Sequence, residues 1–482
     1  MTPELMTRDA MAATRPRAAA LLQRPLEDIL FWHPNQPMAR VTGAIFLRAA
    51  ARVAAALPPA ASYLNLCRNP CGAAIAVAAA LLRGSPCILV TDHSETGIAI
   101  VLERFPHAHP MLDGQDEHGA RFATATVTDP MPGDASGAAP INPMFPLDQI
   151  AVIGITSGST GRPVAHAKSW GALEQRSRAA AQVFGLGVEA GGFQRPVVAS
   201  ESPTHMYGLE TMVLLPLHAA TITWCAASFF PADAAANLAD AAQTAAAAQT
   251  VAAAGGGIAP APVFITTPLH LGALLEAGTL LPPLHAVISA TAPLDAATAS
   301  RAEALWQAPV LEIFGATEVG SIASRRTAEG DAWTLYPGVT LEERDGVTEV
   351  SAEGAPRTPL SDVLEILPDG RFRLVSRGSD IIKRGGRRAS LAGLTRQLAA
   401  LDGVRDAAFL MPDPAPTRSA TARPIAFAVA PGRDAATLLA ELRTRIEPAF
   451  LPRRIILLDR LPRNEIGKLP RDALLALLEK PA

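Results

Sequence analysis

Short apolar runs alternate with helical segments over most of the chain, and this alternation constrains the fold more than any other feature of the sequence. Strands that alternate with helices favour mostly parallel sheets covered by helices on both faces. The runs typical of buried strands are residues 63–67, 85–90, 151–156, 196–200, 221–224, 263–267, 286–291 and 311–318. The segments that predict helices are residues 40–60, 72–82, 171–184 and the alanine-rich stretch 234–257, which ends in a glycine-rich loop. Residues 105–148, rich in Pro, Asp and Gly, are expected to run over the surface.

The pattern changes near residue 330, where short alternating strands with charged turns begin. Asp369-Gly370 lies between two of these strands and is a hairpin signal. The C-terminal part predicts helix 390–401, strands 405–411 and 424–430, helix 435–446, strand 454–458 and helix 471–479. We therefore expect an α/β protein with a large domain over residues 1–376, made of mostly parallel sheets and a β-rich subdomain, and a small α+β domain over residues 377–482.

Composition excludes several classes of function. A hydrophobic content of 49% with 18% charged residues describes a folded globular protein, and a net charge of −3 gives no reason to expect nucleic acid as a partner. Residues 1–24 carry scattered charges and lack the apolar centre of a secretory signal.

The chain has four cysteines, which lack the spacing of a zinc site. We expect them to be buried, reduced thiols of a cytoplasmic protein. They are Cys67, Cys71, Cys87 and Cys225.

Residues 212–230 are uncharged and nearly long enough to span a bilayer. Pro216 and His218 interrupt this run, and residues 221–224 are more typical of a buried strand. We therefore expect no membrane span.

Residues 151–163 join an apolar strand to a turn of glycines and hydroxyl groups. Glycines let successive backbone amides converge on an anion, and hydroxyl groups add further donors, so such a loop can hold phosphate oxygens. It is not a Walker A loop, because no Gly-Lys-Ser/Thr follows. An ordinary surface turn explains the same residues, so partners elsewhere in the chain decide between the two interpretations. The residues concerned are Thr156, Ser157, Gly158, Ser159, Thr160 and Gly161.

Further motifs follow the loop in a fixed order. They are Phe314-Gly-Ala-Thr-Glu318, Asp362, Ser376-Arg377-Gly-Ser-Asp380-Ile-Ile-Lys383 and Pro462-Arg-Asn-Glu-Ile-Gly-Lys468. The ordered set, over roughly residues 40–480, resembles the adenylate-forming superfamily of acyl-CoA synthetases, peptide-synthetase adenylation domains and luciferases. The resemblance implies an ATP-dependent ligase, in which a carboxylate attacks the α-phosphorus of MgATP to give an acyl-adenylate and pyrophosphate. A thiol then takes the acyl group.

The resemblance also implies roles around the nucleotide. The loop 156–161 would cradle the β- and γ-phosphates, Thr317 would hydrogen-bond the α-phosphate, and Glu318 would help to hold Mg²⁺. Asp362 would accept hydrogen bonds from both ribose hydroxyls, and Arg377 would reach the ribose or a phosphate.

Other positions would complete the site. Phe314 with Gly315, and the turn containing Ala290 and Thr291, would flank the adenine, although packing at a strand end explains the turn equally well. Lys468, on a loop of the small domain, would bridge the acid and the α-phosphate and offset the charge that develops there. The small domain would therefore be mobile, since it must close to complete the site and then swing about a hinge.

His205 corresponds to a family position between the acyl pocket and the nucleotide, and a packed core histidine is the competing interpretation. Tyr207 and Trp224 could line an acyl pocket or belong to an ordinary core. His205-Met-Tyr-Gly-Leu-Glu210 and Lys168-Ser-Trp170 resemble segments of the acid-activating ligases of aryl-polyene and xanthomonadin pigment clusters.

The chain departs from the family pattern at several places. Val164 stands where the loop lysine is expected, so that Lys168 or Arg162 could supply the cation instead. Asp362 follows Leu-Ser rather than Thr-Gly, and the hinge aspartate is replaced by Ser379.

The expected acid is aromatic or hydroxyaromatic, with a medium-chain fatty acid as the alternative. The expected acceptor is coenzyme A or the phosphopantetheine arm of an acyl carrier protein. A catalytically inactive nucleotide-binding scaffold is a different possibility, motivated by Val164 and Ser379. Retention of Thr317, Glu318, Asp362 and Lys468 argues against it.

Overall fold

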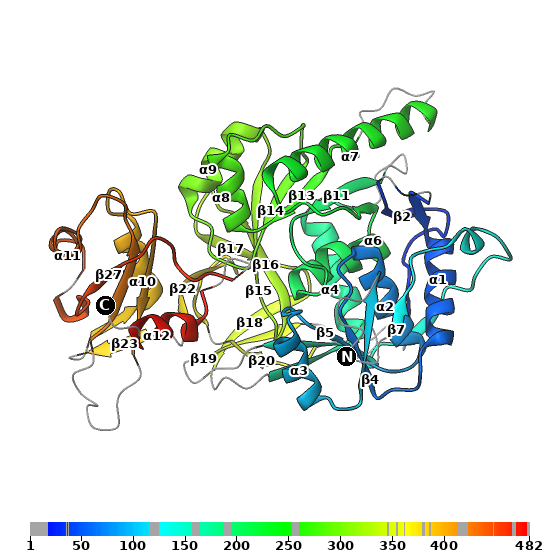
Figure 1. The fold of residues 1–482 in the computed structure, drawn as a ribbon, viewed down its shortest axis with the longest axis horizontal. Helices are drawn as coiled ribbons and strands as arrows, with labels where there is room; N and C mark the ends of the chain where they lie inside the picture. The colour runs from blue at the N-terminus through cyan, green and yellow to red at the C-terminus, as the bar shows by residue number, and fades with distance from the viewer. Residues whose placement is uncertain are drawn as a thin grey trace, which may run out of the picture.

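The chain has an α/β architecture with two large mixed sheets, smaller β-sheets and a C-terminal group of helices and strands (Figure 1). The computed structural model describes residues 18–34, 36, 38–114, 125–156, 164–187, 194–252, 260–344, 347–352, 355–360, 362–377, 381–384, 387–412, 423–446, 448–464 and 469–479. The predicted fold class is confirmed.

The first large sheet contains β9, the strand that runs directly into the candidate phosphate loop at residues 156–161. Among the described residues its strand order is β10-β9-β5-β4-β6-β7, and every neighbouring pair is parallel except β9 and β10. The strands are β4 (Ser62–Asn65), β5 (Cys87–Leu89), β6 (Ala108–Asp113), β7 (Ala125–Val127), β9 (Ile150–Thr156) and β10 (Val164–Ser169). The loop of interest therefore connects two antiparallel strands at the edge of this sheet.

The second large sheet orders eleven strands as β21-β22-β17-β16-β15-β14-β13-β11-β12-β2-β3 within the described residues. The strands from β2 to β15 along this order are parallel, whereas β3, β16, β17, β21 and β22 pair in antiparallel fashion. The parallel strands are β2 (Ile29–Trp32), β11 (Arg195–Ala199), β12 (Thr221–Trp224), β13 (Val263–Thr266), β14 (Ala286–Ser289) and β15 (Val310–Ala316). The others are β3 (Arg40–Thr42), β16 (Gly320–Arg326), β17 (Ala332–Leu335), β21 (Asp362–Ile366) and β22 (Phe372–Arg377).

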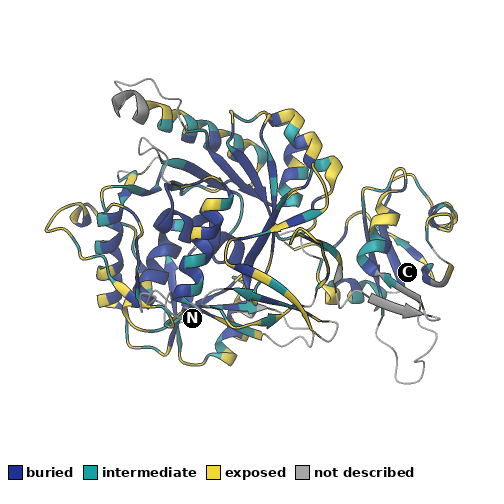
Figure 2. Cartoon of the chain, turned by 180° about the vertical axis from the view of Figure 1, so that it is seen from behind, coloured by how far each residue is buried: buried dark blue, intermediate teal, exposed yellow. Residues whose placement is uncertain are grey.

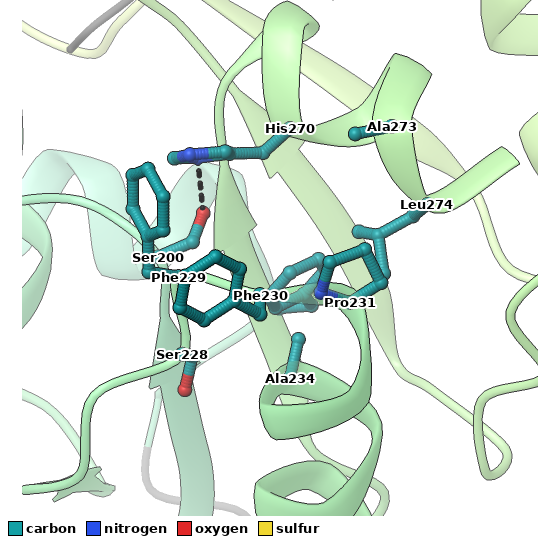
Figure 3. Close-up of a pocket in the computed structure, with 10 residues that line it drawn as sticks. Ser200, Ser228, Phe229, Phe230, Pro231, Ala234, His270, Ala273 and Leu274 are labelled. Atoms are coloured by element: carbon teal, nitrogen blue, oxygen red, sulfur yellow. Dashed lines mark hydrogen bonds between the residues drawn. The ribbon is translucent and has the colours of Figure 1, made fainter. Parts of the chain in front are cut away.

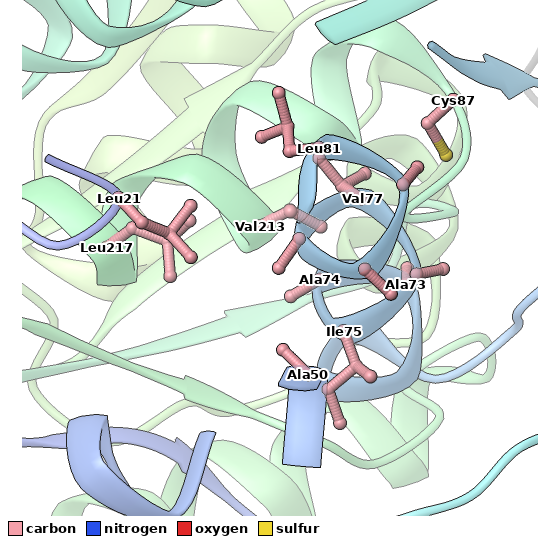
Figure 4. Packing of buried hydrophobic residues seen from close by; sticks show 14 of the residues in the cluster. Leu21, Ala50, Ala73, Ala74, Ile75, Val77, Leu81, Cys87, Val213 and Leu217 are labelled. Atoms are coloured by element: carbon pink, nitrogen blue, oxygen red, sulfur yellow. The ribbon is translucent and has the colours of Figure 1, made fainter. Parts of the chain in front are cut away.

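Helix α2 (Pro70–Leu82) packs between the two large sheets. It contacts β4, β5, β6 and β9 of one sheet and β12 of the other. Its sequence is apolar all round, and residues 71–81 are all buried, as expected for a helix with no solvent-facing side. Figure 4 shows its side chains packed among Ala50 of α1 (Gly43–Ala56), Leu21, Val213 and Leu217.

Side-chain alternation assigns the two faces of the second sheet to different helices. Val198 and Phe264 pack with α7 (Pro231–Ala252), α8 (Pro268–Glu276) and α9 (Ala296–Trp306). Val197 and Ile265 point the other way and pack with α4 (Trp170–Val183) and the helical run 206–218. This run comprises α5 (Met206–Gly208), a π-helical segment (Leu209–Leu214) and α6 (Leu215–His218). Buried residues follow the strands and the inner sides of the helices (Figure 2).

Smaller elements complete the chain. Strand β1 (Ala18–Ala20) pairs with β8 (Met144–Pro146), α3 (Glu95–Arg104) follows β5, and β18 (Val339–Arg344), β19 (Val347–Ala352) and β20 (Thr358–Pro359) form a sheet. The C-terminal elements are β23 (Ile381–Arg384), β24 (Arg387–Ser390), α10 (Leu391–Ala399), β25 (Asp406–Leu410), β26 (Ile425–Val429), α11 (Ala435–Leu442), β27 (Ile455–Leu457) and α12 (Arg471–Glu479). Two clusters of buried residues, one around Leu398 and one around Phe427, join the elements from β24 to α12.

The predicted strands and helices agree with the structure to within a few residues, except that the segment 40–60, predicted as a helix, begins with strand β3 and becomes helical only at Gly43. One further expectation is wrong. Residues 105–148 do not simply run over the surface, because β6 and β7 lie in the first sheet and bury Met111 and Val127. Pro110 inside β6 lowers the strand signal, since proline is depleted in sheet interiors. The sequence pattern does not predict strand β10, because this strand mixes small, polar and charged residues.

None of the helices in the described part of the chain is long and apolar enough to cross a membrane. Residues 212–230 instead contribute to the helical run 206–218 and to β12.

Candidate active site

Three segments that are far apart in the sequence meet at Gly154 of β9. A Cβ atom placed on Gly154 would lie 2.9 Å from Thr317 Cγ2 and 3.4 Å from Met206 Sδ. The strand that leads into the candidate phosphate loop therefore contacts both the Phe314–Glu318 motif and the segment that begins at His205. The resemblance required these segments to share one site, and the structure brings them together.

Thr317 and Glu318 lie at the tip of a hairpin. Strands β15 and β16 pair up to Ala316 and Gly320, and the amide of Val319 donates to the carbonyl of Ala316 at 3.0 Å. Gly320 has a φ of +81°, a left-handed conformation that glycine adopts without steric cost. The hairpin thus holds Thr317 and Glu318 on a short, defined loop rather than on a long connection.

The carboxylate of Glu318 is accessible, since its side chain is 44% exposed. His166 of β10 lies beside it, with Nε2 4.0 Å from Oε1 of Glu318. Burial lowers the pKa of His166; the Glu318 carboxylate opposes this shift, and the Lys168 ammonium adds to it. An exposed carboxylate is a suitable oxygen ligand for a hard cation such as Mg²⁺.

Lys168 lies beneath the same hairpin tip rather than in the loop. Its side chain comes from β10, is only 7% exposed, and donates a hydrogen bond from Nζ to the main-chain carbonyl of Glu318. Burial lowers the pKa of Lys168 to about 8, while the carboxylates of Glu210 and Glu318 oppose the shift. Lys168 therefore bonds the main chain of the hairpin, and its direct contact with a phosphate, for which the ammonium group has further N–H donors, stays a prediction.

Glu210 lies beside the same hairpin, and the sequence alone does not mark it as a candidate site residue. It is 5% exposed, and both carboxylate oxygens accept from the amide of Ser321 at 3.2 Å, with a further hydrogen bond from Ser321 Oγ. Burial raises its pKa, and the hydrogen bonds from Ser321, followed by Arg176 and Lys168, oppose the shift. The available signal was a single acidic residue within the otherwise uncharged run 206–217.

His205 caps the helical run that carries Glu210. Its Nδ1 accepts a hydrogen bond from the amide of Tyr207 at 3.2 Å, so in the neutral ring the proton is on Nε2. Tyr207 itself is buried, and its hydroxyl donates to the carbonyl of Ile288 at 2.8 Å. Tyr207 is therefore a core residue, as is Trp224, whose ring stacks on Trp32 at 5.5 Å.

The predicted adenine-flanking residues follow two neighbouring strands. Ala290 and Thr291 come directly after β14, and Thr291 has a φ of +79°, which is rare for a β-branched residue and marks local backbone strain. Phe314 lies on β15, with its ring 5.5 Å from Trp333 and 5.4 Å from Phe372. That ring belongs to an aromatic core cluster, and its contact with adenine stays a prediction. Gly315 follows at the irregularity in the β15–β16 pairing.

Asp362 and Arg377 are brought together by β-sheet register. They are opposite one another in the antiparallel pair β21–β22, although fifteen positions separate them in the sequence. Residues paired in this way are neighbours on a sheet, as two groups that share one ribose should be. Asp362 is half-buried, and the side chain of Arg377 lies outside the described part of the structure.

Several predicted residues lie outside the described residues, and their roles stay predictions. Thr156 ends β9, but its side chain is not among those described. The others are Ser157, Gly158, Ser159, Thr160, Gly161, Arg162, Ser379, Asp380 and Lys468.

A small pocket lies at the carboxyl ends of β11 and β13 (Figure 3). It is lined mainly by Phe229, Phe230, Leu274 and the ring of His270. His270 Nδ1 lies 3.1 Å from Ser200 Oγ, and a dashed line joins the two side chains in Figure 3. Local sequence patterns do not mark this pocket, because its residues come from four separate segments, at 200, 228–234, 264 and 270–274.

Comparison with known proteins agrees with this arrangement. The family model described as AMP-binding enzyme matches residues 70–342. The 4-coumarate–CoA ligase of Rhodobacter capsulatus is 30% identical over 299 residues, covering 61% of this chain and 66% of that protein. The isonitrile lipopeptide synthase of Streptomyces coeruleorubidus is 36% identical over 129 residues, covering 26% of this chain and 8% of that protein. The matched regions thus span less than two thirds of both relatives.

A solved structure extends the likeness to the whole fold. The o-succinylbenzoate CoA synthetase MenE of Bacillus subtilis, in complex with its acyl-adenylate intermediate, superposes with a TM-score of 0.74. The superposition covers 93% of this chain and 95% of that structure at 19% identity, so it supports the fold alone. Because the family model matches more than half of the 482 residues and covers the Gly154, His205 and Thr317–Glu318 segments, the chain belongs to the AMP-binding enzyme family of the adenylate-forming superfamily.

Proposed function

We propose that the chain is an AMP-forming acid–thiol ligase, which activates a carboxylic acid as an acyl-adenylate and transfers it to a thiol. The observation that carries the proposal is the contact of Gly154 with both Met206 and Thr317. It joins the strand before the phosphate-type loop, the segment of His205 and the Thr317–Glu318 hairpin at one place. A reaction between ATP and an acid requires phosphate-binding and acid-binding groups to meet in this way.

Around the nucleotide, the loop 156–161 would hold the β- and γ-phosphates with its amides and hydroxyls. Thr317 would donate to the α-phosphate from the hairpin tip, and Asp362 with Arg377 would hold the ribose. Glu318 fits a magnesium ion because its carboxylate is exposed on a fixed hairpin. Such an ion, when bound, would neutralise the triphosphate charge.

The acid would approach from the side of the helical run 206–218. Because Nδ1 of His205 accepts from Tyr207, the N–H at Nε2 is the group that can donate to an acid oxygen. Lys468 would bridge the acid and the α-phosphate from the C-terminal domain, which we place at residues 377–482. Placement of Lys468 in a separate domain would make closure of that domain part of the adenylation step.

The proposed acid is aromatic or hydroxyaromatic. The similarity to a protein named 4-coumarate–CoA ligase supports an aromatic acid. The segments that contain Lys168 and His205, which resemble pigment-cluster ligases, support the same class. A medium-chain fatty acid is the alternative.

The proposed acceptor is a phosphopantetheine thiol, either of coenzyme A or of an acyl carrier protein. The ligase relative supports coenzyme A, whereas the similarity to a lipopeptide synthase supports a carrier protein. A scaffold that binds nucleotide without catalysis is the second candidate function, favoured by Val164 at the position of the loop lysine.

Pyrophosphate release separates these functions. The full-length protein is mixed with MgATP and a panel of aromatic, hydroxyaromatic and medium-chain fatty acids, first without a thiol and then with coenzyme A or a holo carrier protein. We expect release with aromatic acids and thioester formation with one of the acceptors. ATP binding without pyrophosphate release for any acid would replace the ligase by the scaffold.

A further inference from the structure

The hairpin that carries Thr317 and Glu318 is held from two sides by buried, charged side chains. On one side, Nζ of Lys168 donates to the main-chain carbonyl of Glu318. On the other side, the carboxylate of Glu210 accepts from the amide and the hydroxyl of Ser321. Neither Lys168 nor Glu210 belongs to the hairpin, since they come from β10 and from the π-helical segment.

Arg176 of α4 completes this cluster. A Cβ atom placed on Gly320 would lie 2.6 Å from Oε1 of Glu210 and 3.8 Å from Cγ of Arg176, so both side chains flank the glycine. Arg176 is buried and interacts electrostatically with Glu210. The cluster therefore contains two cations and one carboxylate next to the hairpin tip.

Burying such groups is costly, because each loses its hydration. Apolar residues of similar size would fill the same space at a lower cost in folding free energy than these charged groups. Packing alone therefore does not explain the cluster. A buried ionic group does, however, impose a defined geometry on the polar atoms that it bonds. Here those atoms are the carbonyl of Glu318 and the amide of Ser321, which immediately flank the hairpin tip.

We propose that Lys168 and Glu210, supported by Arg176, act as positioning residues that fix the orientation of Thr317 and Glu318. The inference rests on the proposed function, in which Glu318 holds the magnesium ion and Thr317 contacts the α-phosphate. In this role Lys168 acts through the Glu318 main chain and not through a contact with the triphosphate. Positioning groups behind a metal ligand contribute roughly 10–100-fold to metal affinity or activity.

The test measures ATP affinity with and without Mg²⁺, in the absence of any acid, by calorimetry on the full-length protein. The variant Lys168→Met keeps the length of the side chain and removes the ammonium group. We expect the gain in ATP affinity that Mg²⁺ provides to fall roughly tenfold or more, with a smaller loss of metal-free ATP affinity because Thr317 shifts with the hairpin. Lys168→Arg, which retains a donor and a charge, should recover part of the gain.

Arg24→Met is the matched control. Arg24 is also a buried cation that donates to main-chain carbonyls, but these belong to Pro216, Ala219 and Thr221. Arg24→Met should lower the melting temperature of the protein and leave the gain in ATP affinity from Mg²⁺ unchanged. If Lys168→Met does not fold, Ser321→Ala tests the other side of the hairpin by removing a single hydroxyl group.

The outcomes separate the inference from the proposed function. A Lys168→Met or Ser321→Ala protein that is less stable but keeps the full Mg²⁺ effect would overturn the inference. Absence of any Mg²⁺ effect in the unmodified protein would also overturn it. Failure of every acid to release pyrophosphate would overturn the ligase proposal alone, because the binding measurement contains no acid. In an active protein, Lys168→Met should lower kcat and leave KM for the acid unchanged.

Discussion

The side-chain methyl group of Thr317 occupies the space in which a side chain at Gly154 would begin. An ideal Cβ atom on Gly154 would lie 2.9 Å from Thr317 Cγ2, closer than side-chain carbons normally approach. Glycine at this position of β9 is therefore required for the hairpin tip to pack against the strand that leads into the phosphate-type loop. The contact explains why a residue without chemistry of its own belongs to the site.

Gly154→Ala should displace Thr317 and reduce adenylation. Overpacking costs about 1–3 kcal/mol of stability, and a misplacement of about 1 Å can lower the rate roughly 100-fold. The measurement is acid-dependent pyrophosphate release, together with thermal unfolding. Gly272→Ala in α8 is the control, because nothing lies within 4 Å of a Cβ there. Equal activity of both variants would show that the Gly154 contact does not position Thr317.

Asp362→Asn should weaken recognition of the ribose. A hydrogen bond to a charged group contributes about 1.5–3 kcal/mol, so KM for ATP should rise roughly 10–100-fold. The unmodified protein should have a lower KM for ATP than for 2′-deoxyATP. This difference between the two KM values should shrink in Asp362→Asn, because the substitution has already weakened a hydrogen bond to the ribose. Glu365→Gln, exposed on the same strand, should change neither value. An unaltered preference for ATP in Asp362→Asn would place the ribose elsewhere.

Lys468→Ala should abolish adenylation and leave the fold intact. Removal of a donor aimed at charge that develops in the transition state lowers the rate by roughly 100–1,000-fold. Pyrophosphate release measures the loss, and circular dichroism and the melting temperature verify folding. Arg460→Ala removes an exposed cation a few positions earlier and should have little effect. Near-normal release by Lys468→Ala would remove this lysine from the site.

Local patterns in the sequence predict most of this fold but only part of the site. Strands such as β12 and β13 are recognisable because their apolar runs are continuous, and the Asp369-Gly370 turn marks the β21–β22 hairpin. The sequence does not predict strand β6, because Pro110 interrupts the pattern of residues typical of a strand. In the structure β6 nevertheless pairs with β4 and β7. Here tertiary context outweighs local preference.

The position of Lys168 shows why the sequence predicts only part of the site. Its sequence position near the loop leaves open whether Lys168 or Arg162 supplies the loop cation, whereas the partner that the structure gives Lys168, the carbonyl of Glu318, lies 150 residues away. The alternation of β10 decides the direction of the side chain, and that strand becomes recognisable only through its pairing with β9. The same holds for Glu210, which lies in the π-helical segment, whereas its partner Ser321 lies on β16 and no local pattern connects the two.

Histidine 218 should make stability depend on pH. His218 is buried against Trp170, with ring centroids 5.5 Å apart, and burial lowers its pKa to about 3; the nearby Leu21 backbone opposes the shift and Arg178 adds to it. The folded-state pKa lies below the unfolded-state value, so the protein gains a proton on unfolding and loses stability as the pH falls below about 6.5.

The loss that His218 contributes between pH 7.5 and pH 5.5 should be about 1.4 kcal/mol. Chemical denaturation at both pH values measures the free energy of unfolding, and comparison with His218→Phe isolates this group from the other histidines. The variant should lose about 1.4 kcal/mol less than the unmodified protein over this interval, because a phenyl ring fills the site without taking up a proton. An identical pH dependence in both proteins would mean that the imidazole becomes protonated inside the fold.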